Sequence, residues 1–109
     1  WAPDAITLLQ RNAARNGARV ETLVAAWGHD ADELAGRGPW DLVLAADVLY
    51  ERRNVGQLLD LLPRLGAEVW LADPGRPAAP EFLEGAARAF AIDSAPDPQH
   101  PAVVHHTLR

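Results

Sequence analysis

Two residues whose side chains could take part in binding or catalysis follow the most apolar segment of the chain. Residues 41–46 read Asp-Leu-Val-Leu-Ala-Ala, and Asp47 and Tyr50 come after them. A carboxylate accepts hydrogen bonds from an amine, and the face of an aromatic ring attracts a cation. Loop residues at the end of a strand are favoured for binding. Asp47 and Tyr50 are therefore candidate catalytic residues; alternatively, Asp47 caps the following turn and Tyr50 packs in the core.

An aromatic ring and an arginine occupy two other loops where predicted strands end. Trp27 has a flat face suited to stacking, although large aromatic side chains often serve only to bury area. Residues 73–77 read Asp-Pro-Gly-Arg-Pro, and the guanidinium of Arg76 could bind a carboxylate or another anion. A plain turn into the next helix also explains the second segment, and it is the interpretation we favour.

Composition excludes several kinds of chemistry. The 109 residues contain no cysteine and no lysine, which rules out thiolate catalysis, disulfides and a Schiff-base lysine. The net charge of -5 argues against a general nucleic-acid-binding surface, so we expect no nucleic-acid partner. The histidines lack the spacing of a metal site, and the adjacent His105 and His106 would point to opposite faces of a strand. We therefore expect no metal.

The sequence also bears on location. No apolar run approaches the roughly 18 residues that span a bilayer, and the first residues lack the basic region of a signal peptide. We expect a cytoplasmic protein without a membrane partner.

Apolar periodicity and turn residues predict an α/β fold, and the continuous apolar run at 41–46 predicts a strand buried on both faces, as in a parallel sheet. Strands alternate with helices, which implies a parallel sheet, and two closing strands joined by a Pro-rich turn should pair antiparallel. Asn54 is the expected N-cap of the second long helix. The predicted helices cover residues 3–16, 54–65 and 80–90, the predicted strands cover 19–24, 41–46, 68–72, 91–94 and 102–108, and 29–38 is a loop with a short helical turn.

Residues 41–50 resemble the fourth-strand motif of methyltransferase family 16, a group of class I S-adenosylmethionine-dependent methyltransferases. The group includes protein lysine methyltransferases and nicotinamide N-methylase-like proteins. The resemblance implies that Asp47 and Tyr50 line the methyl-acceptor site. Residues 24–28 are similar to the stretch after the family's third strand, which implies that Trp27 lies against the adenine of the cofactor, with Ala26 in place of an acid often found there. Ala46 would border the cofactor. Trp1 would either flank the cofactor or belong to a frayed chain terminus.

The resemblance also implies the architecture, a Rossmann-like methyltransferase sheet, mostly parallel with a C-terminal antiparallel hairpin. Residues 1–109 would form the C-terminal portion of a single domain, because no Gly-x-Gly loop or first strands occur among them. In such sheets two strands separate the third from the fourth, so the segment around 20–24 would have no neighbour and the strand at 42–46 would expose an unpaired, hydrophobic edge. We therefore expect the isolated chain to bind S-adenosylmethionine weakly or not at all, and to be aggregated, partly unfolded or stabilised by a partner.

The function implied by the resemblance is methyl transfer from S-adenosylmethionine to a nitrogen of a protein side chain or small molecule. In-line transfer needs chiefly positioning and desolvation. The main alternative is a noncatalytic interaction module or a degenerate methyltransferase remnant. A nicotinamide-dinucleotide oxidoreductase is less favoured because of the closing hairpin and the Asp47-to-Tyr50 spacing. The oligomeric state stays open.

Overall fold

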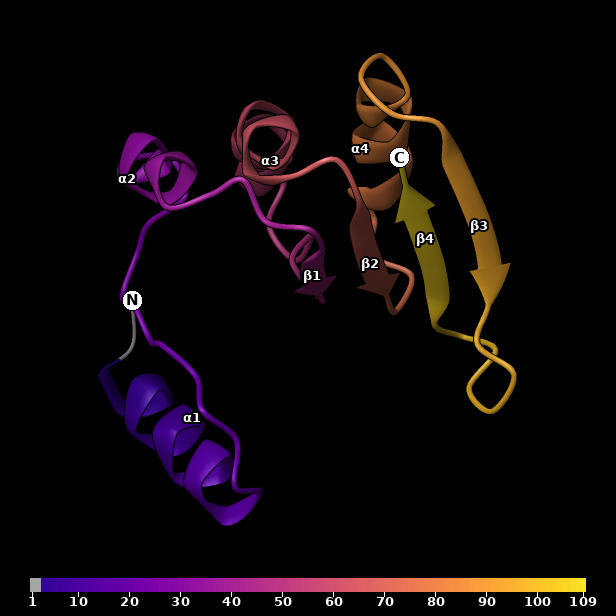
Figure 1. The fold of residues 1–109 in the computed structure, drawn as a ribbon. Coiled ribbons are helices and arrows are strands. Elements are labelled where there is room, and N and C mark those ends of the chain that lie inside the picture. Colours follow the sequence, from indigo (N-terminus) through magenta and orange to yellow (C-terminus); the bar gives the residue numbers. More distant parts are fainter. Residues whose placement is uncertain (1–2) are drawn as a thin grey trace.

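The structure, a computed structural model, describes residues 3–109. Trp1, one of the predicted cofactor contacts, lies outside the described residues. From residue 43 onward, strands and helices alternate and end in a hairpin, as the sequence predicts, whereas two helices come in succession before that point (Figure 1). In chain order they are α1 (Pro3–Arg15), α2 (Ala31–Gly36), β1 (Val43–Ala46), α3 (Arg53–Leu65), β2 (Val69–Asp73), α4 (Ala79–Ala86), β3 (Ile92–Pro96) and β4 (Val104–Leu108).

The strands form one mixed sheet in the order β1-β2-β4-β3. β1 and β2 are parallel, with Ala45 opposite Leu71, and β4 runs antiparallel to both of its neighbours. β1, β2 and β3 therefore point in one direction and β4 in the other, as the arrowheads in Figure 1 show. The predicted α/β class, with a parallel part and a closing antiparallel hairpin, is confirmed.

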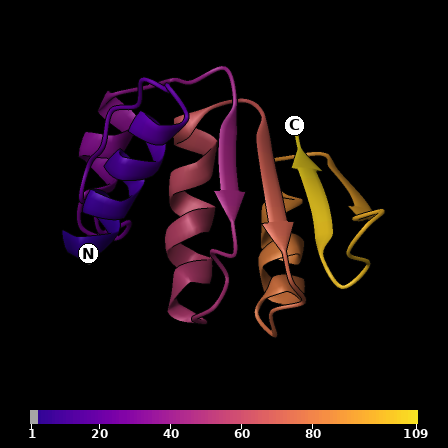
Figure 2. The same ribbon diagram turned by 90° about the horizontal axis from the view of Figure 1, so that it is seen from below.

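The helices α3 and α4 cover one face of the sheet, as the two ribbon views show (Figures 1 and 2). Successive residues of a strand point to opposite faces, so the covered face receives every second side chain. Val69, Leu71 and Leu108 on that face are at most 1% exposed, and Phe82 of α4 is fully buried against them. This single layer of contacts forms the core.

The other face of the sheet has no covering layer among residues 3–109. Leu44 is 72% exposed and Trp70 is 50% exposed, and with Ala46, Ala72 and Thr107 they line an apolar groove of about 530 Å³. The continuous apolar run of β1 predicted a strand buried on both faces, and that prediction is wrong for the described chain. β1 is an edge strand because only β2 pairs with it, which agrees with the exposed edge expected at 42–46. The helices cover only one of its two faces.

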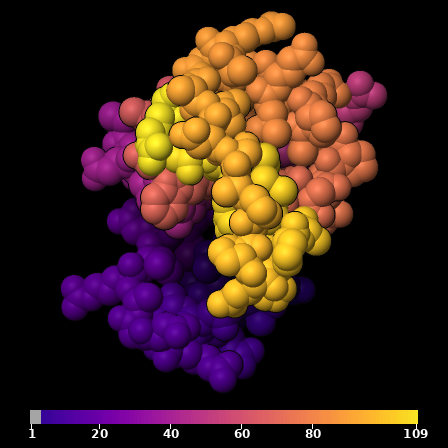
Figure 3. Space-filling view, turned by 90° about the vertical axis from the view of Figure 1, so that its right-hand side faces the viewer, coloured from indigo at the N-terminus to yellow at the C-terminus, as the bar shows by residue number. Residues whose placement is uncertain are grey.

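Residues 18–26 have no regular structure, so the predicted strand at 19–24 is wrong. A strand needs a partner for its backbone groups, and β1, the nearest edge in chain order, pairs only with β2. The segment instead returns along α1, where the amide of Gln10 donates to Thr22 Oγ1 at 3.1 Å. α1 stands apart from the sheet in Figure 1, and the space-filling view in Figure 3 shows the N-terminal residues, in indigo, as a separate lobe.

The remaining helices differ from prediction only in detail. The short helical turn predicted within 29–38 is α2, which Arg64 of α3 ties down through Asp32 at 2.5 Å. α3 begins at Arg53, so Asn54 is not the N-cap; its buried amide donates to the carbonyl of Val48 at 2.9 Å. α4 ends at Ala86, before the predicted residue 90, because the chain tightens there into turns. None of the helices within 3–109 is long and apolar enough to cross a membrane.

The two faces of the sheet should respond differently to the same substitution. Leu71→Ala removes a buried side chain and should lower the free energy of unfolding by about 2–5 kcal/mol. Leu44→Ala, on the open face of the neighbouring strand, should change it by less than about 1 kcal/mol. Urea unfolding followed by circular dichroism measures both variants. Equal losses would show that the open face is covered in solution.

Hydrogen exchange should separate the sheet from the N-terminal segment. β2 pairs on both sides, so amides of Val69–Asp73 should be the most protected in the chain. Amides of residues 20–24 should exchange within about tenfold of the unfolded rate, because none belongs to a strand or helix. Mass spectrometry of a hydrogen–deuterium time course makes the comparison, and strong protection across 20–24 would contradict the structure.

Candidate functional site

The carboxyl ends of β1 and β2 meet at one edge of the sheet because the two strands are parallel. Ala46 lies opposite Ala72, and the next residue, Asp47, extends the ladder by donating its N–H to the carbonyl of Ala72 at 2.9 Å. Asp73 is the last residue of β2. Two acidic residues thus mark the starts of neighbouring loops, at the position where α/β sheets bind ligands.

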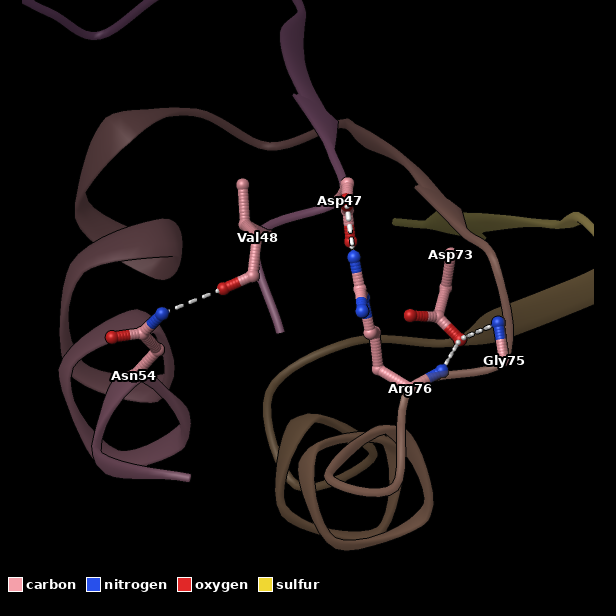
Figure 4. A network of polar contacts seen from close by, with 6 residues as sticks. All are labelled: Asp47, Val48, Asn54, Asp73, Gly75 and Arg76. Atoms are coloured by element: carbon pink, nitrogen blue, oxygen red, sulfur yellow. Dashed lines mark hydrogen bonds and ion pairs between the residues drawn. The ribbon is translucent and has the colours of Figure 1, made fainter. Parts of the chain in front are cut away.

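Asp47 has an unusual backbone conformation and a firmly held side chain. Its φ of 53° lies in the left-handed region, which few residues other than glycine adopt and which Asp tolerates better than most. Its carboxylate accepts two hydrogen bonds from Arg76, Nε to Oδ1 at 2.6 Å and Nη2 to Oδ2 at 2.6 Å (Figure 4). These bonds lower the pKa of Asp47, so the group is ionised at neutral pH.

Arg76 is placed by the turn that follows β2. Asp73 is 3% exposed, and its Oδ2 accepts the backbone N–H groups of Gly75 at 2.9 Å and of Arg76 at 3.0 Å. Gly75 has a φ of 84°, a left-handed conformation that glycine adopts without a steric penalty. The interpretation of 73–77 as a plain turn was therefore incomplete, because the turn also aims Arg76 at Asp47. An Asp two residues before a turn glycine was the available signal.

Tyr50 and Trp27 border the same pocket, which has a volume of about 550 Å³. Tyr50 is 55% exposed, so the alternative that it packs in the core is wrong. Trp27 is partly buried and packs against the core, as its alternative interpretation predicts, and its ring also lines the pocket; stacking on an adenine stays a prediction. The complete lining is Ala25, Ala26, Trp27, Gly28, His29, Tyr50, Arg53, Asn54 and Gln57.

The turn that carries Trp27 is closed by Asp30, a residue that the sequence did not single out. Asp30 Oδ2 accepts the N–H of Ala26 at 2.7 Å, and this bond is the main cause of its lowered pKa. The carbonyl of Ala26 accepts the N–H groups of His29 and Asp30. The backbone of Ala26 is thus already engaged, and the side-chain amide of Gln57 lies against Gly28, where its Nε2 would be 2.6 Å from an added Cβ.

The predicted site residues do not all come together. Ala46 lies on the open face of the sheet and lines the apolar groove there. Asp47 does not line the Trp27 pocket but faces Arg76. Tyr50 connects the two regions, because it also borders a smaller hollow of about 260 Å³ whose walls include Pro77, the residue after Arg76.

The histidines near the sheet have structural partners. His106 is buried, its Nδ1 lies 2.7 Å from Ser94 Oγ, and burial lowers its pKa. His105 is exposed on the other face, and its Nε2 lies 2.9 Å from Asp97 Oδ2. The two rings therefore point to opposite faces, as predicted. Among residues 3–109 no group of three or more His, Cys, Asp or Glu side chains is arranged to hold a metal ion.

Comparison with known proteins identifies the family. A family model described as lysine methyltransferase matches residues 2–70, more than half of the 109-residue chain. The matched stretch contains Ala26, Trp27, Asp47 and Tyr50, and it ends before Asp73 and Arg76. None of the curated proteins compared with the chain matches it. With the predicted motif, the α/β sheet and this match in agreement, the chain belongs to the lysine methyltransferase family, a family of methyltransferases.

Proposed function

We propose that this chain forms the methyl-acceptor side of an S-adenosylmethionine-dependent methyltransferase acting on a nitrogen of a protein side chain or small molecule. The observation that carries the proposal is an ionised carboxylate followed, three residues later, by an exposed aromatic ring in the loop at the carboxyl end of β1. Asp47 is held in one orientation there, and Tyr50 is exposed three residues later. Membership of the family supports the reaction class.

The pocket beside Tyr50 has the character that the cofactor requires at its adenine end. The partly buried ring of Trp27 gives a stacking surface, and the amide of Gln57 gives donor and acceptor groups beside it. S-adenosylmethionine, when bound, supplies a methyl group on a positively charged sulfur. Trp27 and Gln57 would hold the adenine; contacts of the cofactor with Ala26, Ala46 and Trp1 stay predictions.

Asp47 and Tyr50 would orient the acceptor. A carboxylate has about four lone-pair positions, of which Arg76 uses two, so Asp47 can still accept an N–H bond from an acceptor nitrogen. The ring of Tyr50 would border the same nitrogen and favour the positive charge that develops on it. The lowered pKa makes Asp47 a weak base, so the proton released from the nitrogen passes to water. Positioning is then the main contribution of both residues.

One observation favours a second candidate, a noncatalytic interaction module. The open face of the sheet presents Leu44 and Trp70 around an apolar groove, and exposed apolar patches often mark interaction sites. The two candidates differ in outcome. Transfer of a labelled methyl group to nicotinamide or to a lysine-containing peptide by the full-length protein supports the enzyme, whereas its absence from every amine offered supports the module.

Asp47→Ala and Tyr50→Ala should each reduce the rate of methyl transfer by roughly tenfold to a hundredfold, because the acceptor loses its orientation. The affinity for S-adenosylmethionine should fall much less than the rate does, because Asp47 lies outside the pocket of Trp27 and the ring of Tyr50, although it lines that pocket, is assigned to the acceptor. Scintillation counting of a tritiated methyl group and isothermal titration measure the two quantities in the full-length protein. Asp93→Ala, in the distant strand β3, is the matched control. Unchanged transfer with a collapse of cofactor affinity would reverse the assigned roles.

Trp27→Ala should have the opposite effect and weaken cofactor binding by about tenfold or more, because a stacking surface is lost. Trp40→Ala removes a half-exposed side chain of the same type before β1, outside the pocket of Trp27 and the groove of Ala46, and should leave cofactor affinity unchanged. Isothermal titration of both variants provides the comparison, with thermal unfolding to confirm that each is folded. Equal affinities for the two variants would assign Trp27 to the core alone.

A further inference from the structure

Arg76 contributes a charge to the acceptor site from a different loop than Asp47. The two residues are 29 positions apart in the sequence, yet the guanidinium engages both oxygens of the carboxylate at 2.6 Å. Such two-bond pairing fixes the orientation of both planar groups. Figure 4 shows the guanidinium pointing away from α4 toward the end of β1. The position of the Asp47 carboxylate thus depends on the β2–α4 turn.

Asp73 holds the turn that carries Arg76. Its buried Oδ2 accepts the backbone N–H of Arg76, while its Oδ1 is buried without a hydrogen-bond partner among the described residues. The charge of Asp73 therefore adds to that of Asp47 in favouring the protonated guanidinium, and both raise the pKa of Arg76, Asp47 more strongly. A buried carboxylate oxygen without a partner is costly, and fixing the turn that carries Arg76 explains why Asp73 is retained there.

Other charged side chains near this edge are occupied elsewhere. Arg52 pairs with Glu81 of α4 at 2.9 Å, and Arg53 pairs with Glu51. Within residues 3–109, Arg76 is the one charged group that lowers the pKa of Asp47. The electrostatic state of the Asp47 carboxylate therefore depends on Arg76, with Asp73 acting through it.

We propose that Arg76 is a positioning residue of the acceptor site, which fixes the carboxylate of Asp47 and balances its charge so that the acceptor amine is held in its neutral, nucleophilic form. This role rests on the proposed function and deepens it. An uncompensated carboxylate would favour a bound ammonium ion, which has no lone pair to react. With Arg76 in place, Asp47 accepts an N–H bond without retaining the extra proton.

The chemical step shows why the neutral form matters. The lone pair of the nitrogen forms the new N–C bond as the C–S bond breaks, and the electron pair of that bond stays on sulfur. The nitrogen then carries a positive charge and releases one proton to water. An ammonium ion must lose its proton before this step, so a site that favours the ammonium form moves the reaction to higher pH.

The first measurement is independent of activity. In Arg76→Met, the midpoint of the Asp47 carboxyl titration, followed by carbon-13 NMR of the full-length protein, should rise toward the ordinary value for aspartate. Arg76→Lys should give an intermediate value, because lysine keeps the charge but loses the paired geometry. Arg88→Met, an exposed arginine just after α4, is the matched control and should leave the midpoint unchanged.

The second measurement is the pH dependence of kcat for transfer to a lysine-containing peptide. In Arg76→Met the acidic limb should move to higher pH by roughly 0.5–1 unit, since the exposed site screens part of the effect. At neutral pH the rate should fall several-fold, while the affinity for S-adenosylmethionine stays within about twofold. Arg76→Lys should recover most of the pH profile, which a purely structural role would not produce.

The outcomes separate this proposal from the proposed function. Methyl transfer by the unmodified protein, with the same pH profile in Arg76→Met, would overturn the role of Arg76 and leave the proposed function standing. An unchanged Asp47 titration in Arg76→Met would also overturn it. Absence of methyl transfer by the unmodified protein to every amine offered would overturn both, whatever the titration shows.

Discussion

The parallel pairing of β1 with β2 is the constraint on which the rest of the structure depends. It brings the carboxyl ends of two strands to the same edge, and the bond from the Asp47 N–H to the carbonyl of Ala72 carries the pairing one residue into the loop. That bond fixes where the left-handed turn of Asp47 begins. It holds the start of the loop that carries the carboxylate and Tyr50 beside β2, whose following turn carries Arg76. The core serves the same pairing, since α3 and α4 pack on the face that β1 and β2 share.

Much of the fold could be predicted from the sequence because its signals are local. Leucines at helical spacing mark α3, and the acid-Pro-Gly turn marks the end of β2. The failure at residues 19–24 has a different origin, because alternation of polar and apolar residues describes a strand only when a neighbour completes its hydrogen bonds. The burial of β1 was overestimated for a related reason. An apolar run indicates that a segment is stable when both faces are buried, but it does not show that other elements cover both faces. The described residues cover only one face of β1.

The candidate site was predictable in its residues but not in its connections. Asp47, Tyr50 and Trp27 could be selected from type and position, and the pocket brings two of them together. The bond between Asp47 and Arg76 joins residues from two loops, and nothing in either loop alone specifies it. Asn54 shows the same limit on a smaller scale. Its type and position indicated a helix cap, whereas the geometry of the loop before it gave its amide a different acceptor.

The amide of Asn54 has a consequence for recognition. It donates to the carbonyl of Val48, while the N–H of Asp47 donates to the carbonyl of Ala72 in β2. The short loop from Asp47 to Tyr50 is therefore bonded to the sheet at one residue and to α3 at the next. Such a loop loses little conformational entropy when a ligand binds, because its backbone conformation is already formed in the free protein. A ligand of the proposed acceptor site would therefore meet a loop whose backbone shape is already set by these two bonds.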